Sequence, residues 1–166
     1  MEIVDVYDKA GVKTGKTVPR ETHLTPDDYF LVADAIVRNK DGLYLSTKRD
    51  PKKLLDGGKW EFTTGWAQAG ENSLEAAIRE LDEEIGVKAS PRTGKRFGQI
   101  ILENKDFFNF IVDIWLFNID LEISDITLRE GETVDVLFFD KKAILKMQSD
   151  GIFLSRFRVP YIAELP

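Results

Sequence analysis

Apolar and polar residues alternate with the period of a β-strand over several short segments of the chain. Turn residues such as those of Asn39–Gly42 separate these segments. Residues 107–120 are apolar on both faces over much of their length, so we expect this segment to lie at the centre of a sheet. The expected strands span residues 2–7, 12–18, 30–38, 43–47, 60–64, 96–103, 107–120 and 133–139.

Residues 72–85 show helical periodicity instead. Asn72 followed by Glu75 three residues later fits a capping box at the start of a helix. Gly86 suits the left-handed backbone conformation that follows many helices. The apolar residues recur three to four positions apart and predict one buried stripe: Leu74, Ala77, Ile78, Leu81 and Ile85.

The order of these elements predicts the fold class. A second helix is expected over residues 141–148, whereas residues 152–163 fit neither period clearly. Strands, helix, strands, helix is the order of an α/β (α+β) protein in which helices cover a mixed sheet. The chain contains no internal repeat and no linker rich in Pro, Gly or Ser. We therefore expect a single domain over residues 1–166, with residues 1–28 as an N-terminal hairpin and loop extension.

Composition narrows the possible functions. With 43% apolar and 31% charged residues, the chain has the make-up of a soluble globular protein. Its net charge of −6 argues against a nucleic acid or an anionic membrane as partner. The absence of Cys and the single His exclude thiol chemistry and a multi-His metal site within one chain. The N-terminal residues are too charged for a signal peptide and no stretch could span a membrane, so we expect a cytoplasmic protein.

The helix over residues 72–85 carries an unusual group of acids. Glu80, Glu83 and Glu84 fall on one helix face roughly 100° wide, apart from the apolar stripe, while Asp82 points elsewhere. Like charges four residues apart and acids in the last turns both destabilise a helix. Such local conflicts tend to mark functional sites. A divalent cation such as Mg²⁺ would turn the repulsion into binding; the alternative interpretation is a solvated acidic face.

The surrounding sequence favours the first interpretation. Residues 65–87, GWAQAGENSLEAAIRELDEEIGV, fit the pattern G-x5-E-x7-R-E-U-x-E-E-x-G-U, in which U is aliphatic. This is a complete Nudix box, and the chain therefore resembles the Nudix hydrolases. The specified positions are Gly65, Glu71, Arg79, Glu80, Leu81, Glu83, Glu84, Gly86 and Val87.

The resemblance implies a fold and a reaction. Nudix proteins have a mixed β-sheet sandwiched between α-helices. Nudix enzymes typically hydrolyse the pyrophosphate of a nucleoside diphosphate linked to another moiety, by attack of water on phosphorus. The implied cofactor is Mg²⁺ or Mn²⁺, and the implied partner is a small phosphorylated substrate.

The resemblance also assigns roles to the acids of the box. By position, Glu83 and Glu84 correspond to the principal metal ligands. Glu80 corresponds to a further ligand or to a group that helps to activate water. These three residues are the predicted catalytic and metal-binding set.

The other box residues are predicted to be structural. In the family the arginine equivalent to Arg79 holds the helix by an ion pair, and Glu71 is its candidate partner here. Gly65 and Gly86 are expected to permit the backbone turns. Thr64 stands where many relatives have Gly, which affects the loop but not the acids.

Residues outside these roles give weaker hypotheses. Arg49 ends a strand at a place where an Arg often lies near substrate phosphates in the family; a surface or structural ion pair is the alternative. Trp66 could stack on a base or pack in the core. Glu132, and less so Glu130, could supply the further carboxylate that many relatives take from outside the box. Asp113, an acid in an apolar strand, requires a partner, a cation or a hydrated edge.

Two other functions compete with the hydrolase. Residues 2–23 resemble the start of Nudix proteins related to isopentenyl diphosphate isomerase, but the isomerase of this fold uses a catalytic Cys and several His ligands, which this composition lacks. A non-catalytic nucleotide-ligand sensor is the second alternative, although such domains often lose box acids that are all present here. The N-terminal hairpin could also pair with a second copy to form a homodimer, since edge strands pair readily.

Overall fold

Strand β3 (Tyr29–Arg38) lies at the centre of the computed structural model, which describes residues 2–23, 25–103, 108–154 and 161–166. Along one edge β3 pairs in parallel with β8 (Asn109–Asn118), and β8 pairs in turn with the antiparallel β7 (Gly94–Leu102). Along its other edge β3 pairs with the antiparallel β6 (Thr63–Trp66). The expected central position of the apolar strand is confirmed, because β8 lies between two neighbours.

Further strands join β3 at its two ends. At its start, the antiparallel hairpin of β1 (Ile3–Tyr7) and β2 (Lys13–Pro19) joins through the pair Tyr7–Tyr29. At its end, β4 (Tyr44–Arg49) joins through the pair Arg38–Tyr44. Strand β4 also pairs with two antiparallel strands, and the sheet as a whole is mixed, as predicted. These two strands are β5 (Trp60–Glu61) and β9 (Thr133–Phe139).

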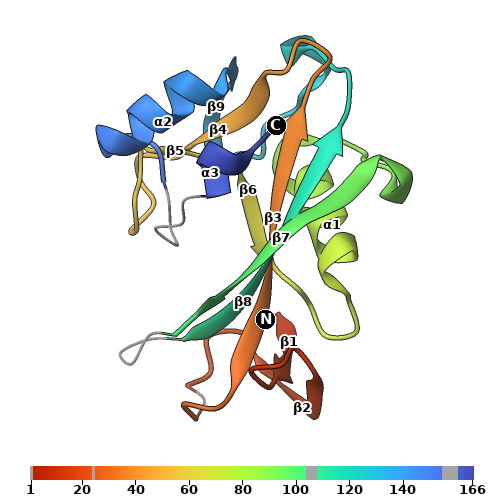
Figure 1. Cartoon of the computed structure of the whole chain (residues 1–166). Helices are drawn as coiled ribbons and strands as arrows, with labels where there is room; N and C mark the ends of the chain where they lie inside the picture. Colours follow the sequence, from red (N-terminus) through yellow and green to blue (C-terminus); the bar gives the residue numbers. More distant parts are fainter. Residues whose placement is uncertain (1, 24, 104–107, 155–160) are drawn as a thin grey trace.

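Helices cover both faces of this sheet (Figure 1). Helix α1 (Ser73–Ile85) lies on one face, and α2 (Lys141–Ser149) with the short α3 (Tyr161–Glu164) lies on the other. Successive side chains of a strand point to opposite faces, so β3 contributes to both cores and must be apolar on both sides. The α1 core includes Ala33, Ala35, Val37, Ala77, Leu81 and Ile85. The opposite core includes Ile36, Tyr44, Ile114, Ile144 and Ile162.

The ends of α1 follow the sequence signals. The Asn72 side chain accepts hydrogen bonds from the backbone N–H groups of Leu74 and Glu75, both at 3.0 Å, and the Glu75 carboxylate accepts the Asn72 N–H at 2.8 Å. Gly86 has φ = 68° and ends the helix in the left-handed conformation. The predicted capping box and glycine cap are confirmed, and they fix the helix frame on which the acids are mounted.

Two predicted elements differ from the structure. The single strand expected over residues 60–64 is two short strands, because Trp60 and Glu61 pair with β4 whereas Thr63–Trp66 pair with β3. The chain changes partner at Phe62. In the ambiguous segment 152–163, α3 begins at Tyr161, and residues 155–160 lie outside the described residues. Residues 104–107 also lie outside the described residues, and they include the first residue of the strand predicted over 107–120. Among the described residues no helix is long and apolar enough to cross a membrane.

Candidate active site

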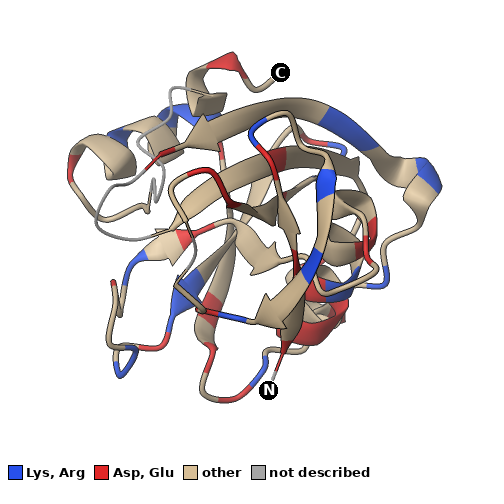
Figure 2. Cartoon of the chain, turned by 90° about the horizontal axis from the view of Figure 1, so that it is seen from below, with Lys and Arg blue, Asp and Glu red and all other residues tan. Residues whose placement is uncertain are grey.

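The three acids of the α1 face line one cleft with a volume of about 480 Å³. The helix supplies the carboxylates, β6 supplies the floor, and the N-terminal hairpin and two loops supply the walls. Figure 2 shows acidic segments of α1 close to the N-terminal end of the chain, as expected from these walls. The lining residues are Glu2, Arg20, Glu21, Arg49, Lys53, Thr64, Gly65, Glu80, Glu83, Glu84, Arg129 and Glu132.

Gly65 makes room for the most buried of these carboxylates. A Cβ atom built on Gly65 would lie 2.0 Å from the carboxyl carbon of Glu80. The Glu80 side chain is only 15% exposed. The requirement for glycine here therefore comes from close packing against Glu80, and not from an unusual backbone conformation.

Arg79 ties the loop before the helix to the acids on it. Its Nε donates to Glu71 Oε1 at 2.8 Å and its Nη2 to Glu71 Oε2 at 3.1 Å, which is a bidentate ion pair. Its Nη2 also donates to the carbonyl oxygen of Trp66 at 2.9 Å. On the helix, its Nη1 donates to Glu80 Oε1 at 2.7 Å and to Glu83 Oε2 at 3.3 Å. The structure thus contains the Arg79–Glu71 pair named from the sequence, and the same guanidinium also orients two acids of the cleft.

Burial changes the proton affinity of Glu80. Removal from water raises the pKa of Glu80 above its ordinary value, the guanidinium of Arg79 opposes this rise, and the charges of Glu83 and Glu2 add to it. For Arg79, burial favours the neutral form, but hydrogen bonds with Glu71 and Glu80 raise its pKa, so it stays charged. Glu80 is therefore a carboxylate with an increased tendency to take up a proton.

The chemistry of the cleft suits a divalent cation, although its acids are not yet arranged around one. Within the described ranges, no three His, Cys, Asp or Glu side chains form a ready cluster of metal ligands. Glu80 and Glu83 are held by Arg79, and Arg129 Nη1 lies 3.8 Å from Glu83 Oε2. The Glu83 side chain is 42% exposed and has room to turn. Carboxylate oxygens are the ligands that Mg²⁺ prefers, so a cation would compete with these arginines for the same oxygens.

Two cations on the loop side of the cleft are engaged by acids. Arg49 Nη1 donates to Glu61 Oε1 at 2.8 Å, and the Arg49 side chain is 15% exposed. Lys53 forms an ion pair with Glu132 across the rim. Of the weaker hypotheses, the structure therefore brings Arg49 and Glu132 to the cleft.

Several lining residues were not identified from the sequence as part of the site: Glu2, Arg20, Glu21, Lys53, Thr64 and Arg129. Arg129 is anchored beside the helix end, since its backbone N–H donates to the carbonyl oxygen of Glu84 at 3.0 Å. Its position next to the predicted acidic segment 130–132 was the available signal. Residues from the hairpin gave no such signal, because only the tertiary fold brings them to the helix.

Trp66 and Asp113 are not among the residues that line the cleft. The Trp66 ring packs against Phe30 and Phe110, with ring centroids 4.8 and 5.2 Å apart. Asp113 accepts hydrogen bonds from Ser73 Oγ at 2.5 Å and from Gln99 Nε2 at 2.8 Å, and it pairs with Arg96.

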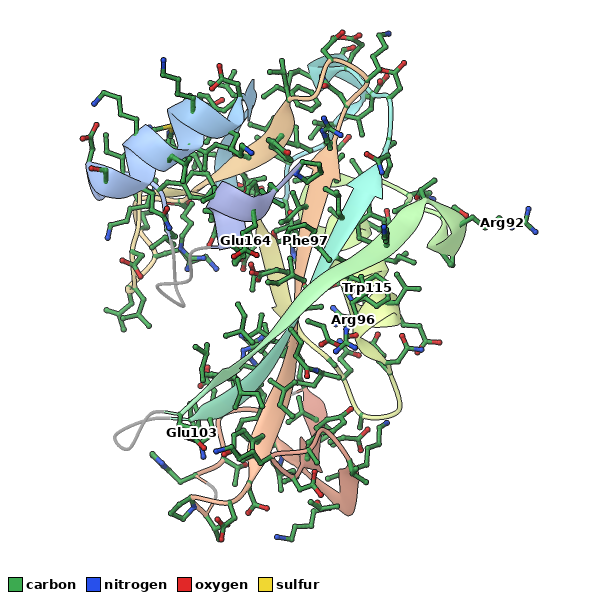
Figure 3. The ribbon with its side chains drawn as sticks, viewed as in Figure 1. Arg92, Arg96, Phe97, Glu103, Trp115 and Glu164 are labelled. Carbon is green, nitrogen blue, oxygen red and sulfur yellow. The ribbon has the colours of Figure 1, made fainter. Side chains whose placement is uncertain are left out.

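These contacts place Asp113 at the start of α1 rather than near its acids. Figure 3 shows Arg96 and Trp115 there, on neighbouring strands β7 and β8. The indole N–H of Trp115 donates to Ser73 Oγ at 3.1 Å, which completes the network around the buried acid. Of the interpretations open for Asp113, pairing with a basic residue is the one that the structure contains.

The chain is similar to known proteins in sequence and in fold. The NUDIX domain family matches residues 28–155. An uncharacterized Nudix hydrolase of Listeria monocytogenes is 31% identical over 159 residues, covering 95% of this chain and 90% of the relative. An RNA pyrophosphohydrolase of Erythrobacter litoralis is 39% identical over 61 residues, covering 37% of this chain and 36% of the relative. The crystal structure of a Deinococcus radiodurans protein has the same fold, with a TM-score of 0.76, 16% identity and 99% of both chains covered.

Proposed function

The chain belongs to the Nudix hydrolase family, and we propose that it hydrolyses the pyrophosphate bond of a nucleoside diphosphate linked to another moiety with the help of Mg²⁺ or Mn²⁺. One observation carries this proposal. Glu80, Glu83 and Glu84 line a single cleft together with cationic side chains from three other segments. A polyphosphate substrate and a divalent cation require this combination of charges.

The three acids have distinct environments that suit distinct roles. Glu83 and Glu84 would hold the cation, because both line the cleft and lie on the more accessible part of the helix, one turn beyond the buried Glu80. When bound, the cation supplies charge neutralisation at the phosphate oxygens and a more acidic water. Glu80, with its raised pKa, is suited to accept a proton from the attacking water or to complete the ligand set.

The cations of the cleft would act on the phosphates. Arg49, Lys53 and Arg129 can neutralise the charge that accumulates on the phosphate oxygens as the water oxygen bonds to phosphorus and the bond to the leaving phosphate oxygen breaks. Arg79 would act indirectly, by positioning Glu80 and Glu83. The net charge of −6 supports a small phosphorylated substrate rather than a nucleic acid or an anionic membrane surface.

The test uses turnover and metal binding together. We expect Mg²⁺- or Mn²⁺-dependent release of phosphate-containing products from at least one member of a panel of nucleotide sugars, dinucleoside polyphosphates, nucleoside triphosphates, NADH and ADP-ribose. Glu83→Gln and Glu84→Gln should each lower kcat by about 100-fold or more, as expected for loss of a metal ligand. Asp82→Asn is the matched control, because Asp82 lies on the same helix but does not line the cleft.

Calorimetry of Mn²⁺ binding gives a readout that does not depend on the substrate. Affinity should fall in the Glu83 and Glu84 variants and stay unchanged in Asp82→Asn. Unaltered metal affinity and turnover in the two variants would contradict the proposed site. Ligand binding without turnover would favour the sensor instead.

A further inference from the structure

The N-terminal hairpin lies outside the part of the chain that matches the NUDIX domain, which begins at residue 28. Nevertheless Glu2, Arg20 and Glu21 line the same cleft as the three acids of α1. The hairpin is therefore positioned to take part in the reaction of the domain to which it is attached.

Two hydrogen bonds join this hairpin to the loop that leads into α1. The backbone N–H of Ala69 donates to the carbonyl oxygen of Ile3 at 2.8 Å. The backbone N–H of Gly70 donates to Asp5 Oδ2 at 2.8 Å. Hydrogen bonds to a carboxylate are among the stronger ones. The position of the hairpin relative to the catalytic helix is therefore set by the loop of the box itself.

Arg20 extends this attachment to the cleft. Its guanidinium lies over the ring of Trp66, 5.0 Å from the ring centroid, while Trp66 itself packs against Phe30. Its Nη1 donates to Glu2 Oε2 at 2.8 Å. The Arg20 side chain is 41% exposed. A guanidinium that stacks on an aromatic ring keeps its N–H groups in a fixed plane with their edges available, which is the geometry used to bind phosphate.

The pair with Glu2 leaves Arg20 accessible to an anionic ligand. Glu2 and Arg20 line the cleft side by side and form an ion pair. The guanidinium of Arg20 is thus held at the cleft wall by a partner that a ligand can replace. A phosphate group can replace the Glu2 carboxylate as the acceptor, because both accept from the same planar fork. Both side chains of the pair are more than 40% exposed, so exchange would bury no unpaired charge.

We propose that Arg20 is a substrate-binding residue that donates hydrogen bonds to a phosphate group of the substrate, so that the hairpin completes the active site. The proposal rests on the proposed function, since it assigns Arg20 to the same phosphorylated substrate. It also gives a role in the site to a segment that lies outside the residues matched by the NUDIX domain family.

The test measures binding of α,β-methylene-ADP, a nucleoside diphosphate analogue that resists hydrolysis, to the full chain by calorimetry in Mg²⁺. Arg20→Gln should weaken binding by about 10-fold or more, as for loss of a charge-assisted hydrogen bond, and Arg20→Lys should lie between. Glu2→Gln should strengthen binding roughly 3-fold, because it replaces the competing carboxylate by a weaker, uncharged acceptor and removes a repelling charge. Lys9→Gln is the matched control: Lys9 is a hairpin cation in an exposed pair with Glu103, outside the cleft.

The opposite effects of the two variants distinguish binding from a structural role. If the Arg20–Glu2 pair only held the hairpin in place, both variants would weaken binding and lower Tm together. Equal affinity of wild type and Arg20→Gln, or no binding by the wild type at millimolar analogue, would overturn the proposal. Arg20-dependent binding without turnover of any substrate would sink the hydrolase and retain this role of Arg20. Turnover with a KM unchanged in Arg20→Gln would support the hydrolase and overturn the proposed role of Arg20.

Discussion

The carboxyl group of Glu80 occupies the space that a side chain on Gly65 would fill, since a Cβ there would lie 2.0 Å from both the carboxyl carbon and Oε1. Gly65 belongs to β6, which pairs directly with the central strand at Ala33. The floor of the cleft is therefore held by the sheet, and the carboxyl group of Glu80 packs directly against it. A small change in the strand must be taken up by Glu80.

Gly65→Ala should consequently lower activity more than stability. The atoms in the way belong to the end of a flexible side chain, so Glu80 can turn aside while β6 keeps its place. We expect kcat to fall by about 100-fold, since a displacement near 1 Å at a reacting group has this effect. The control is Gly98→Ala in β7, where an added Cβ would lie 3.9 Å from Ile114, an ordinary contact. Equal kcat in the two variants would contradict the role given to Glu80.

The raised pKa of Glu80 gives a prediction for metal-free protein. Between the ordinary pKa of 4.5 and the higher folded value, the folded state holds a proton that the unfolded state releases. The free energy of unfolding therefore falls as pH rises through this window. Glu80→Gln carries no charge at this position, so it avoids the cost of burying an ionised carboxylate. In urea denaturation at pH 7 in EDTA it should therefore be more stable than the wild type. A less stable variant would show that the Arg79 contact outweighs the burial of the charge.

Glu71 should act in the opposite direction and in another pH range. Burial opposes its ionisation, but Arg79 and the Gln68 N–H lower its pKa below the ordinary value of 4.5. Its contribution to stability is thus complete above pH 4.5 and is lost as pH falls through the lower folded value. Glu71→Gln should cost about 1–3 kcal/mol at pH 7, because it leaves the half-buried Arg79 without its bidentate partner. The gap from wild type should narrow on acidification; a gap independent of pH would mean that the charge of Glu71 is not what stabilises the fold.

The local part of the site could be predicted from the sequence, whereas the contribution of the N-terminal hairpin could not. Asn72, Glu75 and Gly86 act through neighbours within a few residues, so their signals survive in the linear chain. The pairing of Arg79 with Glu71, eight residues away, was implied by the resemblance to the Nudix box. Arg20 reaches the cleft only because the hairpin joins the start of β3 and folds back onto the loop of the box. No periodicity encodes such contacts.

Trp66 shows the complementary difficulty. Its place inside the box loop suggests a contact with substrate, but neighbouring residues on a strand point to opposite faces. In the structure Gly65 lines the cleft while the Trp66 ring packs on Phe30 beneath Arg20. The direction of a side chain next to a strand end depends on which neighbour the strand pairs with, and the sequence did not reveal that β6 pairs with β3.

A last prediction concerns two tyrosines that each donate a hydrogen bond to a carboxylate. Tyr161 OH lies 2.9 Å from Asp34 Oδ2, and Tyr29 OH lies 2.6 Å from Glu103 Oε1. Burial and the nearby Asp34 raise the pKa of Tyr161, and the hydrogen bond with Glu103 raises that of Tyr29 to about 12, so both are neutral donors at pH 7. The two acids differ, since Asp34 is 3% exposed and the Glu103 side chain is 55% exposed.

Replacing either tyrosine by Phe removes a hydrogen bond of the same kind, from a phenol to a carboxylate. The acid that remains is buried in the case of Asp34 and hydrated in the case of Glu103. Tyr161→Phe should lower the free energy of unfolding by about 1–3 kcal/mol, because buried Asp34 loses a donor that water cannot replace. Tyr29→Phe should cost clearly less, since water can solvate Glu103. Asp34 also accepts from Thr64 Oγ1 at 2.8 Å, and Thr64 lines the cleft, so Tyr161→Phe should loosen the cleft floor as well. Urea denaturation of both variants at pH 7 decides the point: an equal or larger loss in Tyr29→Phe would show that α3 is not held to the sheet through Asp34.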